Sequence, residues 1–138
     1  MIKTKSIYAL KNKSDGVRIL ITRYWPRGIK KENVDKWHKD LSPSKELLKN
    51  YKANKIEFQS FEKLFREEIT GNTHVHDLCK GIAIEAAEGK EITLLCYEKE
   101  EANCHRKIIK QLCERKFRLL NKHKNKSQER IDKQRILL

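Results

Sequence analysis

Residues 91–97 read Glu-Ile-Thr-Leu-Leu-Cys-Tyr, an almost continuously apolar stretch. A strand with one wet face alternates apolar and polar residues, whereas a continuous apolar run is typical of a strand covered on both faces, as in parallel sheets. Residues 17–22, Val-Arg-Ile-Leu-Ile-Thr, are rich in β-branched residues and predict a second strand. Residues 2–10 predict a shorter third one. The strand at 91–97 therefore favours a parallel sheet with a covering layer on each face.

The segments between these strands carry helical patterns. Apolar residues at helical spacing predict helices around residues 34–41, 47–51, 56–69 and 74–88, followed by a long helix that continues past residue 117. The first of these helices is expected to place Trp37 in the core. The predicted fold class is α/β: a small, mainly parallel sheet flanked by helices in three layers, Rossmann-like or flavodoxin-like, with a long C-terminal helix.

Charge divides the chain. Its 138 residues include 32 Lys and Arg against 19 Asp and Glu, a net charge of +13, and residues 115–138 alone hold nine basic against two acidic residues. We therefore predict an α/β domain over residues 1–117 and a basic helical extension over residues 118–138.

No apolar run approaches the roughly 20 residues that span a bilayer, and the N-terminus lacks a secretory pattern. These features exclude membrane and secreted classes and indicate a cytoplasmic protein.

Candidate functional residues follow two of the predicted strands. Ligands of open α/β sheets bind beyond the carboxyl ends of the strands, where helix N-termini also point. If the strands at 17–22 and 91–97 are parallel neighbours, one rim of the sheet collects eight candidates: Arg23, Trp25, Arg27, Cys96, Glu98, Cys104, His105 and Arg106. The remaining cysteines, Cys79 and Cys113, are expected to be small buried apolar residues.

The arginines of this rim predict an anion-binding pocket. A guanidinium is a planar fork that suits phosphate or carboxylate, and the N–H groups of a helix start add to its pull on an anion. The competing interpretation is that Arg23, Arg27 and Arg106 pair with acidic neighbours and only fix the loops. Trp25 has two interpretations as well, a plug of the loop over the core or an aromatic platform for a ligand.

The cysteines of the rim predict an alternative function, a cysteine-dependent enzyme acting on an anionic small molecule. A thiol beside cations at a helix start has a lowered pKa and is more nucleophilic. Cys104 or Cys96 would be the nucleophile, and His105 or Glu98 would move protons. Adjacent helical residues point about 100° apart, so His105 is expected to be a poorly placed base for Cys104.

Metal binding is a third use of the same residues. Cys96, Cys104 and His105 offer three ligands, and a fourth would come from His74 and His76, two positions apart, or from Cys79. The spacing matches no structural zinc pattern, so no metal site is predicted. No cofactor is predicted either.

Two separated motifs resemble a known family. Residues 18–29, Arg-Ile-Leu-Ile-Thr-Arg-Tyr-Trp-Pro-Arg-Gly-Ile, followed by Trp37 and a Leu-Ser-Pro-Ser step at 41–44, resemble the opening signature of domain of unknown function family 488 (DUF488), in its YeaO-like branch. Residues 93–98 and 103–106 resemble that family's Leu-Leu-Cys-x-Glu and Cys-His-Arg block. The resemblance covers residues 2–117. It implies a compact three-layer α/β fold, a cytoplasmic prokaryotic protein and one shared site at the rim, without an established activity.

Three partners are predicted. The rim favours an anionic small molecule, and the basic surface favours nucleic acid, bound without sequence preference because no DNA- or RNA-binding signature is present. A homodimer through the C-terminal extension is the third prediction. Leu119, Leu120 and the apolar residues of 131–138 indicate that the distal helix docks on protein, either this chain or a second copy, with its lysines facing solvent.

Overall fold

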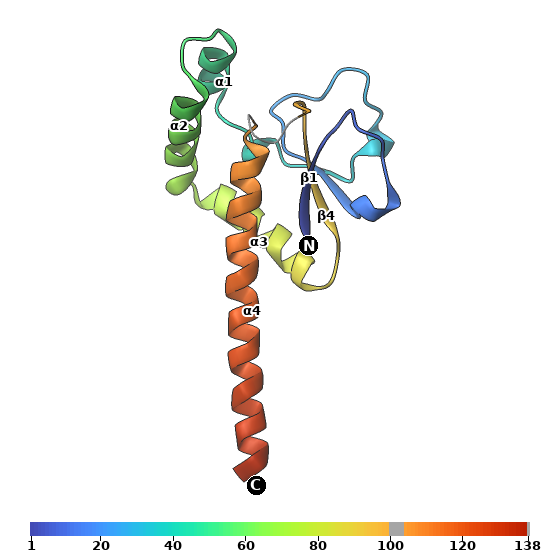
Figure 1. Cartoon of the computed structure of the whole chain (residues 1–138), viewed down its shortest axis with the longest axis vertical. Coiled ribbons are helices and arrows are strands. Elements are labelled where there is room, and N and C mark those ends of the chain that lie inside the picture. The colour runs from blue at the N-terminus through green and yellow to red at the C-terminus, as the bar shows by residue number, and fades with distance from the viewer. Residues whose placement is uncertain (100–103, 138) are drawn as a thin grey trace.

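The computed structural model describes residues 1–99 and 104–137 and centres on a small parallel sheet. Its strands are β1 (Ile2–Ser6), β2 (Val17–Leu20), β3 (Lys36–Trp37) and β4 (Ile92–Cys96), in the order β1-β4-β2-β3 with every pairing parallel. All five residues of β4 are buried, as its apolar sequence predicts. β4 thus forms the centre of the fold (Figure 1).

A glycine sets the start of β2. The chain leaves β1, passes through a short 3-10 helix, Lys13–Asp15, and enters β2 two places away in the sheet, because β4 lies between the two. Gly16 joins the 3-10 helix to β2 with φ +66°, and a Cβ there would lie 2.1 Å from the carbonyl oxygen of Glu91. The main chains of β2 and β4 therefore approach each other as closely as only glycine allows.

Four α-helices accompany the sheet in the described residues. They are α1 (Lys45–Lys52), α2 (Phe58–Thr70), α3 (Thr73–Ala87) and α4 (Arg106–Leu137). The Ser44 hydroxyl accepts the N–H of Leu47 at the start of α1, and Gly71 follows the end of α2, as the sequence patterns predict. The α/β class, the parallel sheet and the long C-terminal helix are confirmed.

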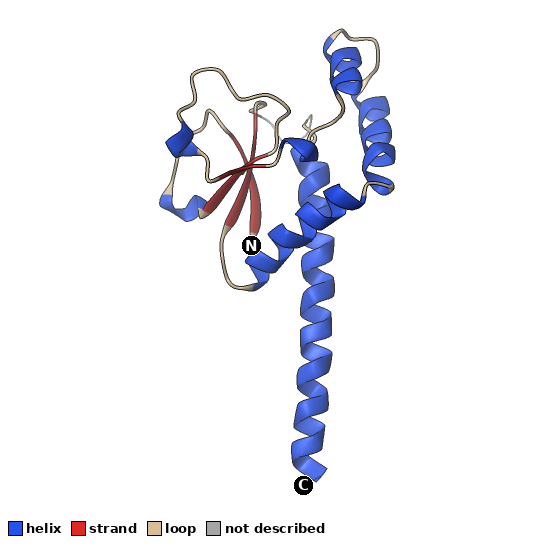
Figure 2. Ribbon diagram, turned by 180° about the vertical axis from the view of Figure 1, so that it is seen from behind, coloured by secondary structure: helices blue, strands red, loops and turns tan. Residues whose placement is uncertain are grey.

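The two faces of the sheet are covered differently. Alternate residues of the strands, such as Ile19 and Leu94, share one apolar core with α2, α3 and the first turns of α4. The opposite face carries a smaller cluster of Ile7, Leu20 and Leu95, closed by the half-buried Trp25. Figure 2 shows this second face under loops and 3-10 turns, with the long helices on the other side of the strands.

The helix predicted over residues 34–41 is wrong. These residues contribute to β3 and to the 3-10 helices Lys31–Asn33 and Lys39–Leu41. The edge of β2 binds this backbone: the N–H of Asp35 donates to Arg18 and the N–H of His38 to Leu20. As a result Trp37 is 39% exposed instead of buried in the core, although its indole N–H donates to the carbonyl of Thr22.

The helix α4 continues well past Phe117, as predicted, but its distal half lies free of the rest of this chain. The described side chains from residue 122 to 135 are exposed, and Figures 1 and 2 show this part projecting away from the domain. The distal helix was predicted to dock either on this chain or on a second copy. It does not dock on the described part of this chain. Within the described residues, no helix is both long enough and apolar enough for a bilayer crossing.

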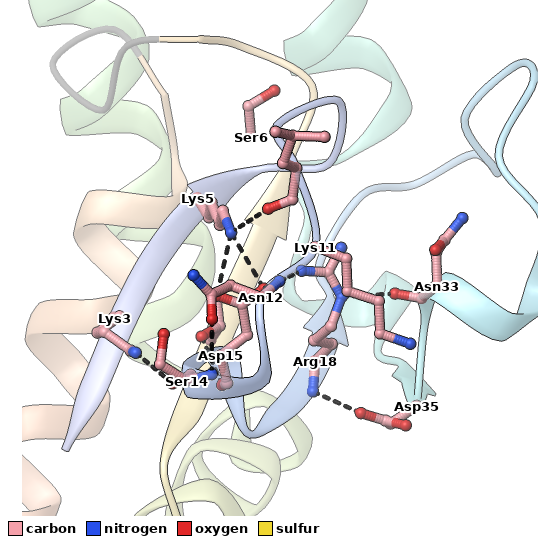
Figure 3. A network of polar contacts seen from close by, with 12 residues as sticks. Lys3, Lys5, Ser6, Lys11, Asn12, Ser14, Asp15, Arg18, Asn33 and Asp35 are labelled. Atoms are coloured by element: carbon pink, nitrogen blue, oxygen red, sulfur yellow. Dashed lines mark hydrogen bonds and ion pairs between the residues drawn. The ribbon is translucent and has the colours of Figure 1, made fainter.

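A network of buried charges holds the start of β2 (Figure 3). Asp15 accepts hydrogen bonds from Lys5 Nζ at 3.1 Å, from the guanidinium of Arg18 and from the N–H of Asn12 at 3.0 Å. Arg18 is 2% exposed, and its Nε donates to the carbonyl of Asn33 at 2.7 Å. Burial opposes ionisation of Asp15, but these donors outweigh it and lower the pKa of the carboxyl.

Candidate functional site

Two thiols and an imidazole meet at the carboxyl end of β4. Cys96 is the last residue of β4, and Cys104 and His105 directly precede α4. Because α4 packs along β1 and β4, its N-terminus lies beside the end of the central strand. Cys96, Cys104 and His105 are 1%, 2% and 6% exposed. The rule that parallel sheets carry their sites at the strand ends therefore located this cluster from the sequence.

The distances within the cluster are short. The sulfurs of Cys104 and Cys96 lie 2.8 Å apart, and His105 Nδ1 lies 3.7 Å from Cys96 Sγ and 3.8 Å from Cys104 Sγ. The expectation that His105 is badly placed for Cys104 is wrong. It assumed that both residues are helical, whereas α4 begins only at Arg106 and the turn before it brings both side chains together.

The orientation of His105 is fixed by a hydrogen bond at Nε2, the ring nitrogen that does not contact the thiols. Its Nε2 lies 2.7 Å from the carbonyl oxygen of Ile21, which follows β2. A carbonyl only accepts, so Nε2 carries the hydrogen and Nδ1 presents its lone pair to the two thiols. Phe65 of α2 packs edge-on against the ring, with 5.7 Å between ring centroids. The imidazole therefore offers a proton acceptor to the cysteines from a constrained position.

The two thiols have opposite acidities. The hydrogen bond with Cys96, helped by the contact with His105, outweighs burial and lowers the pKa of Cys104 to about 6. The same thiol–thiol hydrogen bond, together with burial, raises the pKa of Cys96. The N-terminus of α4 adds to this asymmetry, since helix starts stabilise thiolates. At neutral pH the pair therefore holds one proton, on Cys96, and Cys104 is a thiolate.

Glu98 and Arg106 frame the cluster. Cys96 Sγ donates to Glu98 Oε2 at 3.2 Å. Desolvation raises the pKa of Glu98, but the hydrogen bonds at the carboxylate and the nearby His105 together lower it by more, so the carboxylate is ionised. Arg106 is buried and donates to the carbonyls of Glu98 at 2.7 Å and Lys99 at 3.1 Å. Its guanidinium thus holds the turn that follows β4.

Arg23 lies at a separate cavity on the same side of the domain. Its Nε and Nη2 donate to the carbonyls of Pro43 and Ser42 at 3.1 and 3.2 Å, and no bond of its Nη1 is found among the described residues. The cavity has a volume of ≈ 380 Å³, and its lining includes the basic Arg23, the acidic Asp40 and Glu68, and Phe65. Phe65 thus borders both this cavity and His105. The Ser42 hydroxyl is buried without a hydrogen-bond partner in the described residues.

The other two predicted ligand-binding residues lie elsewhere on the loop. Trp25 is half-buried, donates its indole N–H to the carbonyl of Ile29 at 2.8 Å and packs edge-on against Trp37. It therefore closes the second apolar cluster, as the plug interpretation has it. Arg27 is exposed, and its carbonyl accepts the hydroxyl of Tyr8 at 3.2 Å.

The three potential metal ligands do converge. Ligand atoms of Cys96, Cys104 and His105 lie within 4.8 Å of one another, a group of three in the described residues. Ligand sulfurs around tetrahedral zinc lie about 3.8 Å apart, given Zn–S bonds of about 2.3 Å, so the 2.8 Å between these sulfurs fits a hydrogen-bonded thiol pair better than a zinc site. Of the fourth ligands considered, His74 is bound to Asp40 at 3.0 Å and Cys79 is in the main core.

Two contributors to the site were not found from the sequence. Phe65 was predicted only as a core residue of its helix, and the carbonyl of Ile21 carries no side-chain signal. A phenylalanine on the apolar face of α2 gives no hint of contact with an imidazole 40 positions away. The one available clue was the position of Ile21 at the end of its predicted strand, two residues before Arg23.

Most of the chain is similar to known proteins. A family model described as the active DUF488-N3 subclade matches residues 2–116. The uncharacterized protein YeaO of Escherichia coli K12 is 32% identical over 110 residues, which cover 78% of this chain and 92% of that protein. The uncharacterized protein Rv3073c of Mycobacterium tuberculosis H37Rv is 33% identical over 81 residues, covering 57% and 69% of the two chains. No solved structure matches the chain significantly.

Proposed function

The chain belongs to the DUF488 family, and from this premise we propose that it is a cysteine-dependent enzyme with Cys104 as nucleophile, acting on an anionic small molecule. The observation that carries the proposal is the contact of a thiol pair with the lone-pair nitrogen of His105, whose other nitrogen donates to Ile21. A nucleophile, an adjacent base and a group that orients the base are the parts that covalent catalysis needs. The description of the matching family model as an active subclade is consistent with a chemical role.

In the proposed reaction, Cys104 attacks an electrophilic carbon of the substrate. Its sulfur lone pair forms the S–C bond, and the leaving group departs with the electron pair of the bond that breaks. The proton lost by Cys104 resides on His105 Nδ1, 3.8 Å from the sulfur, and passes to the leaving group. Water then attacks the same carbon and gives one proton to His105. The S–C bond breaks, Cys104 leaves as a thiolate with the electron pair, and the product is released.

Cys96 has a positioning role in this proposal. Its sulfur lies 2.8 Å from Cys104 Sγ, and the hydrogen bond between them stabilises the thiolate form of Cys104. When Cys104 is not ionised, the thiol hydrogen of Cys96 is donated to Glu98, whose Oε2 lies 3.2 Å from Cys96 Sγ. The hydrogen bond with Cys96 therefore acts together with His105 to keep the nucleophile charged.

Arg23 supplies the anion-binding part. Of the three arginines predicted for this role, Arg106 uses both terminal nitrogens on main-chain carbonyls and Arg27 is exposed on the loop. Arg23 keeps Nη1 for a ligand, lines the cavity of ≈ 380 Å³ and lies two residues from the carbonyl that holds His105. An anionic group in that cavity would lie across Phe65 from the imidazole.

Thiol reactivity tests the nucleophile. We expect the ultraviolet thiolate absorbance of the native chain to rise with a midpoint near pH 6, and iodoacetamide labelling of Cys104 to rise with the same midpoint, at an absolute rate reduced by the burial of this thiol, which is 2% exposed. Cys104→Ser should remove both signals, whereas Cys79→Ser, in the core, should retain them. A midpoint near that of a free thiol, or equal labelling of all cysteines, would overturn the proposal.

A matched pair of arginine variants tests the anion. We expect inorganic phosphate to slow the labelling of Cys104 by occupying the cavity lined by Arg23, which Phe65 separates from His105. Arg23→Gln should abolish this protection, and Arg27→Gln, which removes the same charge from an exposed position, should keep it. Equal protection in both variants would show that phosphate acts only by screening the net charge of +13.

A further inference from the structure

The projecting part of α4 carries its charges in a stripe. At 100° per residue, six of its basic side chains fall within an arc of about 120° around the helix axis. They are Arg115, Arg118, Lys122, Lys126, Arg130 and Lys133, which we call the basic stripe. Every one of them is exposed. At 1.5 Å per residue the stripe is about 27 Å long.

The charges of the basic stripe are not used within the domain. Closer to the sheet, Lys110 pairs with Glu114 on the same helix at 3.9 Å. No ion pair of a stripe residue is found among the described residues, and Glu129 is the one acidic side chain within the same arc. Six cations without an ion pair among the described residues form a surface for an external polyanion.

The distribution of apolar residues excludes other occupants of the stripe. A helix that lies in a membrane surface needs a broad apolar face opposite its charges. Here Leu119 points into the stripe, and opposite it the apolar Leu120 and Ile131 alternate with Lys124 and Ser127. A second copy of the stripe would meet it with like charge. The basic stripe thus lacks the apolar face that docking on a membrane or on a second copy of the helix would need.

We propose that the basic stripe of α4 binds the phosphates of duplex DNA, with the helix in the major groove. That groove is about 12 Å wide and admits an α-helix, which is about 10–12 Å in diameter with its side chains. Figures 1 and 2 show the distal helix standing clear of the domain, so a duplex can lie against residues 122–133 of the stripe without meeting the sheet or α1–α3, whereas Arg115 lies beside α2 and α3. Duplex RNA offers the same phosphates but a deep, narrow major groove that excludes a helix. This proposal is independent of the chemistry at Cys104.

Two double variants of the full chain test the position of the contact. Lys122→Gln/Lys126→Gln removes two charges from the stripe, and Lys124→Gln/Arg135→Gln removes two from the opposite side of the same exposed helix. Glutamine keeps the helix propensity of lysine and arginine, so circular dichroism should be unchanged in both. Binding is measured by fluorescence anisotropy with a labelled duplex of about 20 base pairs, from about 50 to 300 mM salt.

The salt dependence decides the outcome. The slope of log affinity against log salt changes by about 0.9 for each phosphate contact, so the stripe variant should lose about 2 from the slope. We expect its affinity to fall at least tenfold, and that of the control variant by less than threefold. Equal weakening of both variants, no binding by the full chain, or tighter binding to an RNA duplex or to phosphatidylserine vesicles would overturn the proposal.

Discussion

Two clusters of ionisable side chains lie at opposite ends of the sheet, and they are built in opposite ways. At the start of β2, the carboxylate of Asp15 meets the cations of Lys5 and Arg18, so buried charge is matched by opposite charge. At the end of β4, Cys104 and Cys96 face each other beside the imidazole of His105, without an acidic–basic ion pair between them. The first cluster therefore keeps one protonation state near neutral pH. In the second cluster, a proton can transfer between the thiols and the neighbouring imidazole.

The difference separates structural from chemical roles for buried polar groups. A fully paired network resists change because removing any member leaves a buried charge alone. A thiol pair beside an imidazole loses little stability when altered, since cysteine packs as a small apolar residue. Perturbed pKa values occur in both clusters, so the pKa of Asp15 alone would not have distinguished them.

The largest expected effect is on stability, at the first cluster. Asp15→Ala leaves the guanidinium of Arg18 buried without its carboxylate, and we expect it to lower the free energy of unfolding by about 3–5 kcal/mol. Urea denaturation measures this value. Cys104→Ala in the second cluster should cost about 1 kcal/mol by the same assay, since it removes only a small buried group.

A double variant sharpens the comparison. Arg18→Met removes the stranded charge, so Asp15→Ala/Arg18→Met should recover part of the loss seen in Asp15→Ala. Equal destabilisation by Asp15→Ala and Cys104→Ala, or no recovery in the double variant, would contradict the assignment of the two clusters to different roles.

The second expected effect is on acidity, at the thiol pair. The hydrogen bond with Cys96 is the largest cause of the low pKa of Cys104. Cys96→Ala removes that partner and should move the midpoint of thiolate formation upward from about 6, by roughly one pH unit or more, so that labelling at pH 6 slows about fivefold or more. Cys96→Ser keeps a donor and should retain most of the effect. The same midpoint in both variants would assign the low pKa to His105 instead.

How much the sequence predicted depended on the range of the interactions involved. The strands β2 and β4 and the helices α1, α2 and α3 follow from local apolar periodicity and caps such as Ser44, and the strand-end rule brought Cys96, Cys104 and His105 together. The failures came from long-range contacts. The edge of β2 binds the backbone of residues 35–38 and overrides their helical pattern. The turn before α4, the Arg18–Asp15 pair and the carbonyl of Ile21 became visible only in the folded chain.

The smallest expected effect concerns the distal half of α4. Truncation after Leu120 removes a segment whose described side chains are exposed, so the thermal midpoint should stay within about 2 °C of that of the full chain. A fall of more than about 5 °C would contradict a helix that contributes nothing to the stability of the domain.

Light scattering on the full chain and on the chain truncated after Leu120 tests the homodimer predicted from the sequence. Residues 115–138 of each copy carry nine basic against two acidic residues and repel each other, so we expect a monomer at low salt; a dimer that forms only at high salt and disappears on truncation would show that the helix docks on a second copy. DNA binding has the opposite dependence and weakens as salt rises. A monomer mass for both proteins at every salt concentration would contradict the dimer and leave a polyanion as the partner of the helix.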